Sequence, residues 1–567
     1  MEMVSLKIDN ISVSVPEGTT ILNAAKQAQI NIPTLCYLPE INEIGACRIC
    51  CVEVEGGARL VSACNTPAEN GMVVFTNSPL VRASRKTNLE LILSEHDCHC
   101  PTCIRNGNCT LQSLAAEFNI TEQLYNSKIA KNIKNTLPVV RENSKCIKCM
   151  RCVEVCEKVQ GLGIWDVTGT GEHTKITVKA GLSMEKNCAL CGQCITHCPT
   201  GALHERDDTA KVYEALADEN TVTVIQIAPA VRSAWAENLG ISEAAATEKR
   251  MVAAVKALGF DYVFDTDWAA DLTIMEEGSE LIDRVKNGGK FPMFTSCCPG
   301  WVRFMKSEYP ELAKNLSTAK SPQQMFGAVA KSYFAEKIGV NPENIFCVSV
   351  MPCTAKKFEV TIPNLNDACG KPDVDCSITT RELARLIRAD HIDVAALPEA
   401  EFDSPLGTAT GAGVIFGATG GVLEAALRSA YFLIKGENPD ADAFHFVRND
   451  GNALRSATVD IDGIKLNVAV TSGLANTRQL LDDMKCGKVN YDFVEIMACP
   501  GGCSGGGGQP IFDGKEMASV RGEKLYALDF ANEIRFSHEN PTVKTIYDEF
   551  LGQPLSSKSH KLLHTEI

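Results

Sequence analysis

The sequence predicts a cysteine-rich part built from small α+β modules, followed by an α/β domain in which parallel sheets are flanked by helices. Two observations predict this fold class. Most of the 26 cysteines in the 567-residue chain lie before residue 200, in close spacings. After Asp207 the cysteines become rare, and short apolar strands alternate with longer helical patterns, as at residues 222–227, 248–258 and 261–264. At about 100 to 200 residues per domain, the length predicts about four domains.

The composition excludes several classes of protein. The chain is 45% hydrophobic and 22% charged, as expected for an ordered globular protein. Its longest apolar stretches, such as residues 222–230 and 345–351, are shorter than the roughly 20 residues of a membrane-spanning helix. The first residues do not resemble a secretion signal, and the formal net charge of −15 argues against binding to nucleic acid or an anionic membrane. We therefore expect a cytoplasmic protein with no membrane span and no nucleic-acid partner.

The number of cysteines indicates metal binding. Thiols stay reduced in the cytoplasm, where closely spaced cysteines usually bind metals or take part in catalysis. A disulfide scaffold is the alternative, but that architecture is typical of small secreted proteins.

The first module, residues 1–79, has the pattern of a small sheet crossed by one helix. Residues 6–15 alternate apolar and polar side chains around Asp9-Asn10, which is typical of a hairpin. Residues 20–28 carry apolar side chains at helical spacing after a Gly-Thr-Thr sequence that can cap a helix. Four cysteines depart from the plant-type 2Fe-2S spacing but keep its close pair and its distant fourth ligand. These candidate ligands are Cys36, Cys47, Cys50 and Cys64.

A second metal site is expected within residues 80–125, where a helical stretch at 81–95 leads into one histidine and three cysteines. One imidazole with three thiolates fits zinc or a 4Fe-4S cluster, and the spacing does not choose between them. The candidate ligands are His96, Cys100, Cys103 and Cys109. A polar connector, residues 126–135, separates this site from the next module.

Residues 139–209 contain an internal repeat, in which Cys-x-x-Cys-x-x-Cys-x-x-x-Cys occurs twice. In this run three cysteines hold one 4Fe-4S cluster, and the fourth reaches across to the other. Isolated zinc sites are the alternative, but they do not require a reciprocal repeat. The repeat therefore predicts two clusters, one held by Cys146, Cys149, Cys152 and Cys198 and the other by Cys188, Cys191, Cys194 and Cys156.

Three apolar runs in the α/β domain, residues 291–298, 344–353 and 493–499, end in cysteine, and Cys503 follows the last one. Ligands of open parallel sheets bind outside the carboxyl ends of the strands, so these cysteines are expected to converge on one site. Because the N-terminal clusters carry electrons and have no substrate chemistry of their own, this site is expected to hold a redox catalyst.

These runs carry a resemblance to a known family. They read Phe294-Thr-Ser-Cys-Cys-Pro-Gly-Trp301, Val350-Met-Pro-Cys-Thr-Ala-Lys-Lys-Phe-Glu359 and Glu495-Ile-Met-Ala-Cys-Pro-Gly-Gly-Cys503. The sequence resembles the iron-only (FeFe) hydrogenases, in particular the large monomeric clostridial type, over nearly the whole chain. The resemblance implies a plant-type 2Fe-2S domain at 1–79, a His/Cys3 4Fe-4S domain at 80–125 and a two-cluster ferredoxin domain at 139–209. It also implies a two-lobed catalytic domain at 210–567 that ends in a small-subunit-like segment.

The resemblance further implies an H-cluster, in which a 4Fe-4S cube is joined to a diiron subsite bearing CO, cyanide and an azadithiolate. The implied cube ligands are Cys298, Cys353, Cys499 and Cys503, of which Cys503 bridges to the diiron unit. The residues implied to contact the diiron subsite are Lys356, Met351, Met497, Gln323 and Pro229. Position 230 is Ala where several relatives have Ser, so a side-chain hydrogen bond to a cyanide is missing there.

A proton path is also implied by the resemblance. Its members would be Cys297, Glu277, Ser317, Glu280 and Arg284. Residues 274–286 have a helical pattern, and the three charged members at 277, 280 and 284 are spaced i, i+3 and i+7, on one face. Such a face is more often simply solvated, which is the alternative interpretation.

We therefore expect a hydrogenase that interconverts protons and H₂, exchanges electrons with a ferredoxin or flavodoxin, depends on maturases for the diiron unit and acts as a monomer. The alternatives are the catalytic subunit of an NADH-linked electron-bifurcating complex and a non-catalytic iron–sulfur scaffold or hydrogen sensor. Six cysteines receive no function, although Cys369 and Cys376 fall in a Gly/Pro/Asp-rich stretch where exposure would make them reactive. The other four are Cys51, Cys98, Cys347 and Cys486.

Overall fold

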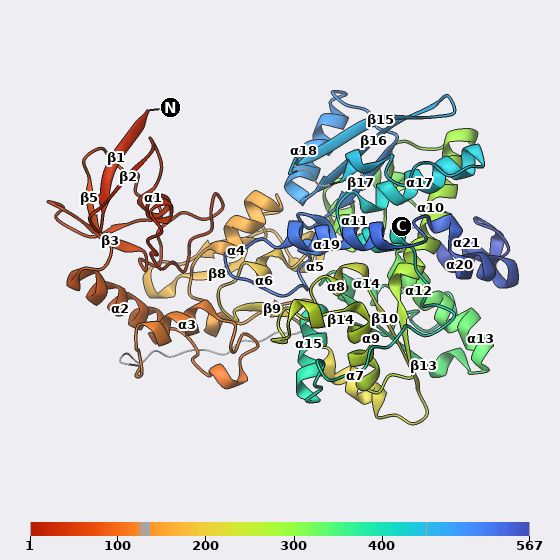
Figure 1. The fold of residues 1–567 in the computed structure, drawn as a ribbon, viewed down its shortest axis with the longest axis horizontal. Coiled ribbons are helices and arrows are strands. Elements are labelled where there is room, and N and C mark those ends of the chain that lie inside the picture. Colours follow the sequence, from red (N-terminus) through yellow and green to blue (C-terminus); the bar gives the residue numbers. More distant parts are fainter. Residues whose placement is uncertain (1, 124, 126–136, 449–450, 566–567) are drawn as a thin grey trace.

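The computed structural model describes residues 2–123, 125, 137–448 and 451–565. The N-terminal modules lie at one end of the molecule (Figure 1). The larger part that begins at residue 210, predicted above to be the catalytic domain and called the catalytic part below, lies at the other end. The polar connector expected at 126–135 lies outside the described residues. Among the described residues, no helix is both long enough and apolar enough to cross a membrane.

The first module is the expected sheet with one helix. The hairpin of β1 (Met3–Ile8) and β2 (Ile11–Pro16) turns at Asp9 and Asn10, whose φ angles of 46° and 70° are those of a tight two-residue turn. Helix α1 (Ile21–Gln27) begins where the Thr20 hydroxyl accepts a hydrogen bond from the Asn23 amide. The sheet order is β2-β1-β5-β3-β4. The remaining strands are β3 (Cys51–Val54), β4 (Val61–Ser62) and β5 (Val73–Phe75).

The next two modules are small and rich in loops. Helix α2 (Pro79–Ser94), capped by the Ser78 side chain, and helix α3 (Thr110–Glu117) flank the histidine and cysteines of the second module. In the third module the repeat is visible in the backbone, because α4 (Arg151–Glu154) and α6 (Gln193–Thr196) each follow a left-handed residue, Met150 and Gly192. Its strands are β6 (Val139–Arg141), β7 (Trp165–Thr168), β8 (Lys175–Val178) and β9 (Leu203–Glu205).

The catalytic part contains two four-stranded sheets, as expected for two lobes. The first has the order β11-β10-β13-β14 and is parallel throughout. The second has the order β12-β17-β16-β15 and is parallel except for the pair β15 and β16. The first sheet consists of β10 (Val222–Ile227), β11 (Tyr262–Asp265), β13 (Ile345–Met351) and β14 (Cys376–Thr379). The second consists of β12 (Met293–Phe294), β15 (Leu454–Ile461), β16 (Ile464–Ser472) and β17 (Phe493–Met497).

Helix α10 (Thr266–Asn287) lies between the two lobes and contributes to the core of each. Trp268 and Leu272 pack into the core on the side of the first sheet, and Ala270 and Ile274 into that of the second. The helix contacts α12 (Pro322–Val329), α16 (Gly411–Val414) and α17 (Gly421–Lys435). Because both lobes hold it, α10 is a fixed support for the polar residues along it.

The C-terminal segment is helical and packs on the catalytic lobes (Figure 1). It contains α19 (Ala518–Ala531), α20 (Pro541–Ile546) and α21 (Ser557–Leu563). After α21 the chain runs alongside the segment that precedes α12, where Ala319 and His564 form an antiparallel bridge.

Candidate functional site

A cavity lies between the two lobes, where the cysteine-tipped runs meet. Its wall is formed by the ends of β13 and β17 and by the starts of α8 (Pro229–Arg232), α10, α11 (Pro299–Glu308) and α14 (Lys356–Glu359). Because β13 and β17 belong to different sheets, the cysteines converge between the two lobes rather than at the edge of one sheet. Most of the wall is apolar, including Ala228, Ala230, Ala270 and Phe416. The sequence-predicted residues that line the cavity are Pro229, Cys297, Cys298, Gln323, Met351, Cys353, Lys356, Met497 and Cys503.

Three of the four cysteines predicted to hold the cube line this cavity, and the fourth, Cys499, lies close enough to them for their charges to raise its pKa, after burial. Cys298 precedes α11, Cys353 follows β13, and Cys499 and Cys503 follow β17. Burial and the neighbouring Cys298 thiol raise the pKa of Cys353 to about 12. Cys499 does not line the cavity; its Sγ lies 3.8 Å from the Cys191 carbonyl oxygen of the two-cluster module. Crowded, buried thiols of this kind fit an iron–sulfur cluster, because thiolates are its protein ligands.

Lys356 provides the positive charge in the cavity wall. Its Nζ lies 2.9 and 3.1 Å from the two carboxyl oxygens of Glu359, one turn further along α14. Burial lowers the pKa of Lys356, but Glu359 and the nearby thiols outweigh burial and leave the pKa above its usual value. The ammonium group is therefore charged in a site from which most water is excluded.

Glu359 is a residue of the site that sequence reasoning missed. Besides the ion pair with Lys356, its carboxylate accepts hydrogen bonds from Ser321 Oγ at 2.9 Å and Gln323 Nε2 at 2.7 Å. The side-chain amide oxygen of Gln323, Oε1, accepts from Ser349 Oγ at 2.6 Å. Glu359 thus orients two of the side chains that face the cavity. Its i, i+3 spacing from Lys356 was the available signal.

The predicted proton path follows α10 away from the cavity. Ser317 Oγ donates to Glu280 Oε2 at 2.8 Å, and Arg284 pairs with the other oxygen of Glu280 at 2.5 Å. Glu277 is 1% exposed and Glu280 is 9% exposed, so the interpretation of this face as solvated is wrong. The structure therefore joins the outer three members by direct contacts.

Glu277 lies between those three residues and Cys297. Both of its carboxyl oxygens are buried without a hydrogen-bond partner among the described residues. Burial, with a contribution from the nearby Glu280, raises the pKa of Glu277 to about 8, while the Ser317 hydroxyl opposes this rise. The Glu277 charge in turn helps to raise the pKa of Cys297, for which burial is the main cause. The Glu277 carboxyl thus lies near both Ser317 and Cys297. Its raised pKa favours the protonated form at neutral pH.

The cysteines of the first module lie together. Contact between the Cys36 and Cys47 thiols lowers the pKa of Cys36 and raises that of Cys47, and Cys50 and Cys64 form an equivalent pair. In the second module, the Cys109 thiol lies 3.7 Å from the Pro199 carbonyl oxygen, and the buried His96 Nδ1 has no hydrogen-bond partner among the described residues. Over the described ranges, no three His, Cys, Asp or Glu side chains are arranged to hold a single metal ion.

The structure brings together cysteines of both runs of the repeat in the two-cluster module. Cys146, Cys149, Cys152 and Cys198 line one small cavity. Near Cys194, the thiols of Cys156 and Cys188 both contribute to raising its pKa, after burial, which is the main cause. Each group of four therefore includes the distant cysteine of the other run.

The remaining cysteines differ in exposure. Cys376 is buried in strand β14 rather than lying in a loop, so the expectation that it could be a reactive loop cysteine is wrong. Cys369 is partly buried, Cys98 and Cys486 are exposed, and Cys51 and Cys347 are buried.

Glycines bring the two-cluster module against the catalytic part. A Cβ added at Gly507 would lie 2.2 Å from the Cys191 carbonyl oxygen, and one at Gly506 would lie 2.0 Å from the Pro352 carbonyl oxygen. The Gly-rich run 505–508 thus lets the backbone pass between Cys191 of the two-cluster module and Pro352, the residue before Cys353.

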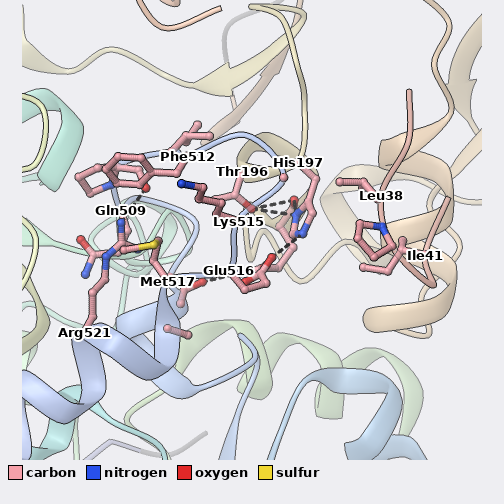
Figure 2. A pocket seen from close by; sticks show the side chains of 18 residues that line it. Leu38, Ile41, Thr196, His197, Gln509, Phe512, Lys515, Glu516, Met517 and Arg521 are labelled. Carbon is pink, nitrogen blue, oxygen red and sulfur yellow. Dashed lines mark hydrogen bonds and ion pairs between the residues drawn. The ribbon is translucent and has the colours of Figure 1, made fainter. Parts of the chain in front are cut away.

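Three regions of the chain also meet around a second cavity. Figure 2 shows Leu38 and Ile41 of the first module on one side and residues of the C-terminal segment on the other. Between them, His197 Nε2 lies 3.0 Å from a carboxyl oxygen of Glu516. This junction holds the N-terminal modules against the catalytic part.

Comparisons with known proteins agree with this arrangement. Residues 221–507 match the family model described as iron only hydrogenase large subunit, C-terminal domain. Residues 1–79 match a 2Fe-2S iron-sulfur cluster binding domain, and residues 515–566 match the iron hydrogenase small subunit. Residues 85–123 match the NADH-ubiquinone oxidoreductase-G iron-sulfur binding region, and residues 136–204 match the ferredoxin-like domain of NADH-quinone oxidoreductase subunit 3.

Individual proteins are similar over long stretches. The chain is 46% identical to the NADP-reducing hydrogenase subunit HndD of Solidesulfovibrio fructosivorans, over 100% of this chain and 99% of that protein. It is 39% identical to iron hydrogenase 1 of Clostridium pasteurianum, over 99% of each chain. A solved structure of an apo FeFe-hydrogenase from Chlamydomonas reinhardtii is 41% identical, with a TM-score of 0.56, and covers 62% of this chain and 98% of its own. With family models covering the catalytic part and the N-terminal iron–sulfur regions, the chain belongs to the iron-only hydrogenase family.

Proposed function

We propose that this protein catalyses the reversible reaction 2H⁺ + 2e⁻ ⇌ H₂ at an H-cluster in the cavity between its lobes. The observation that carries the proposal is that one cavity gathers buried cysteines, a charged lysine and two methionines. Ser317, Glu280 and Arg284 are also joined to one another by direct contacts. When bound, the H-cluster supplies the metal centre at which protons and electrons combine.

In this proposal the side chains of the cavity hold and orient the H-cluster. Cys298, Cys353, Cys499 and Cys503 would hold the cube, with Cys503 as the cysteine shared with the diiron subsite. The Lys356 ammonium would supply a charge-assisted hydrogen bond to an anionic cyanide. The thioethers of Met351 and Met497 fill the apolar wall without competing as hard ligands. Pro229 and Gln323 complete the wall.

Protons reach the cavity through side chains. We propose the order Arg284, Glu280, Ser317, Glu277 and Cys297, from the outer end of α10 inwards. Proton transfer requires heavy atoms within about 2.6 to 3.2 Å of each other, directly or through one water. The contact between Ser317 and Glu280 meets this requirement. The raised pKa of Glu277 supports its role, because a group that titrates near neutral pH both accepts and releases a proton readily.

Electrons are proposed to pass along one 2Fe-2S and three 4Fe-4S clusters in the N-terminal modules. The ligands are Cys36, Cys47, Cys50 and Cys64; His96, Cys100, Cys103 and Cys109; and the two groups of four in the two-cluster module. A ferredoxin or flavodoxin is the proposed carrier for a monomeric enzyme, and maturases would insert the diiron unit.

A second arrangement is favoured by one comparison. The similarity to a subunit named as NADP-reducing over 100% of this chain supports a role as the catalytic subunit of a nicotinamide-linked complex. Purification of the protein from its source at low salt distinguishes the two. Partner subunits that reduce or oxidise a nicotinamide nucleotide support the complex, and an isolated chain that exchanges electrons with ferredoxin supports the monomer.

The catalytic proposal is tested by infrared spectra of the anaerobically matured protein, recorded under argon and then under H₂. Bands in the CO and cyanide stretching region that shift when H₂ is added are the expected result. Absence of such bands from a sample with full iron–sulfur content and verified maturation would contradict the catalytic proposal. The protein would then be a scaffold or an electron conduit.

A further inference from the structure

We propose that His564, in the C-terminal segment, is a positioning residue for proton transfer: it fixes the Ser317–Thr318 backbone against helix α10, so that the Ser317 hydroxyl stays within reach of Glu280. This inference rests on the proposed proton path. It concerns a residue that lies outside the cavity and far along the chain from every cysteine ligand proposed above.

The backbone on both sides of His564 is tied to the segment that carries Ser317. The Lys320 amide donates to the Leu563 carbonyl oxygen at 2.8 Å, and the Thr565 amide donates to the Thr318 carbonyl oxygen at 2.8 Å. These two bonds flank the antiparallel bridge between Ala319 and His564. Residues 563–565 thus pair with residues 318–320 in the manner of a short antiparallel strand.

The imidazole of His564 connects this strand to α10. Its Nε2 lies 3.0 Å from Glu276 Oε2, and its Nδ1 lies 2.8 Å from Thr318 Oγ1. A carboxylate only accepts hydrogen bonds, so Nε2 carries the proton, and in the neutral ring Nδ1 accepts from the Thr318 hydroxyl. The ring is 4% exposed, and Glu276 is fully buried. Glu276 also accepts hydrogen bonds from Tyr547 and Ser559, which hold the same carboxylate in place.

Both partners of His564 are sequence neighbours of proposed path residues. Glu276 precedes Glu277 on α10, and Thr318 follows Ser317. The Thr318 amide itself donates to Glu280 Oε2 at 3.1 Å, the oxygen that also accepts from Ser317. His564 therefore closes a ring of contacts that sets the distance between α10 and the Ser317 hydroxyl. A misplacement of about 1 Å in such a site can cost roughly 100-fold in rate.

The experiment compares three single variants in the matured holoenzyme. In His564→Ala the kcat for H₂ evolution with reduced viologen is expected to fall about 10-fold to 100-fold, while the KM for H₂ and the CO and cyanide bands stay unchanged. His564→Gln keeps a donor for Glu276 and is expected to recover part of the lost rate. His560→Ala is the matched control, since His560 lies in α21, which ends just before His564, and stacks on His564 but is exposed; its kcat is expected to be normal.

A second readout needs no H-cluster. Hydrogen–deuterium exchange of the unmatured chain is expected to be faster at residues 317–320 in His564→Ala than in the unaltered protein or in His560→Ala. If the His564 variant does not fold, Thr318→Val removes the hydroxyl with little change of shape and is expected to lower kcat in the same way.

The outcomes separate this inference from the proton path itself. Normal kcat in both His564→Ala and Thr318→Val, alongside a Glu280→Gln variant that is nearly inactive, would overturn the role of His564 and leave the path standing. Normal kcat in Glu280→Gln would overturn the path, and the inference with it. A lower kcat in His564→Ala accompanied by shifted infrared bands would also overturn the inference, because the residue would then act on the cofactor pocket.

Discussion

The carboxyl group of Glu277 combines deep burial with the absence of a hydrogen-bond partner among the described residues. Burial, with a contribution from the nearby Glu280, disfavours the charged form and raises the pKa of Glu277 to about 8, which favours the protonated form at neutral pH. This links its role in proton transfer to a measurable property of the fold. The native state holds a proton on Glu277 between pH 4.5 and 8, whereas the unfolded chain releases it.

The pH dependence of stability follows from that difference. Since the folded pKa lies above the unfolded one, the contribution of Glu277 is fully present below about pH 4.5 and is lost as pH rises towards 8. The glutamine side chain in Glu277→Gln cannot ionise. The free energy of unfolding of this variant, relative to the unaltered protein, should therefore rise between pH 4.5 and pH 8, by a few kcal/mol. Thermal unfolding of the unmatured proteins at pH 5 and pH 8 measures this difference. An advantage of equal size at both pH values would show that Glu277 titrates normally.

Cys297 is the proposed last member of the proton path. Cys297→Ala should leave the iron content per chain intact but lower H₂ turnover by at least about 100-fold, the usual contribution of a positioned acid or base. Gas chromatography of evolved H₂ and an iron assay measure the two quantities. Cys486→Ala is the control, because Cys486 is exposed and has no proposed role. Turnover of Cys297→Ala that equals this control would remove Cys297 from the path.

At the scale of single elements, the one-turn helix α14 arranges the charged part of the cavity wall. Glu359→Gln would leave the buried Lys356 ammonium without its counter-charge, and breaking a buried pair costs about 3 kcal/mol or more. We expect a loss of this size when unfolding of the unmatured protein in urea is followed by tryptophan fluorescence. The same substitution at Glu343, whose pair with Lys371 is half exposed, should change stability by less than about 0.5 kcal/mol. Equal effects in both variants would contradict this role for Glu359.

Helix α10 shows how far element prediction reaches. The pattern predicts a helix at 274–286, within the observed Thr266–Asn287. Its first two turns were missed because both faces are buried, with Asp267 and Asp271 among apolar residues, so no single apolar stripe marks them. By contrast, a local sequence signal marks the hairpin of β15 and β16. Asp462-Gly463 is a typical two-residue hairpin turn, and both residues have positive φ.

In the candidate site, too, residues close together in the sequence are easier to predict than contacts between distant segments. Cysteines with fixed spacing, such as the two runs of the repeat, could be assigned from sequence because neighbouring ligands share one loop. Contacts such as those of Glu359 with Ser321, or of His564 with Glu276, join segments far apart in the chain. No local spacing encodes these contacts, because they depend on how the lobes and the C-terminal segment pack.

At the scale of the whole molecule, buried polar groups link the first module to the two-cluster module. Arg151 is 2% exposed and donates to the Cys36 and Tyr37 carbonyl oxygens of the first module at 3.2 and 3.0 Å. It also pairs with Asp513 near the C-terminal segment. The Asn42 side chain donates through Nδ2 to the Cys36 and Cys149 carbonyl oxygens at 2.6 and 2.9 Å, and so links a cysteine of each module.

These links predict that electron delivery can be weakened without altering the active site. Modules joined by small polar interfaces move relative to each other unless specific contacts hold them, and a planar guanidinium makes several directional bonds that a thioether cannot make. In Arg151→Met, H₂ evolution driven by reduced ferredoxin should therefore fall about 10-fold, a loss comparable with one buried charge-assisted hydrogen bond. Evolution driven by reduced methyl viologen, a small donor that does not depend on docking to the first module, should stay within about 2-fold of normal.

The ratio of the two rates is the quantity to measure, with iron content checked in each preparation. Arg82→Ala serves as the control, because Arg82 is exposed on α2 and its loss should leave the ratio unchanged. If both donors lost rate equally in Arg151→Met, the substitution would have damaged the catalytic part. If neither lost rate, electrons would enter at a cluster beyond the first module, and the nicotinamide-linked arrangement would gain support, since its partner subunits could then dock elsewhere on the chain.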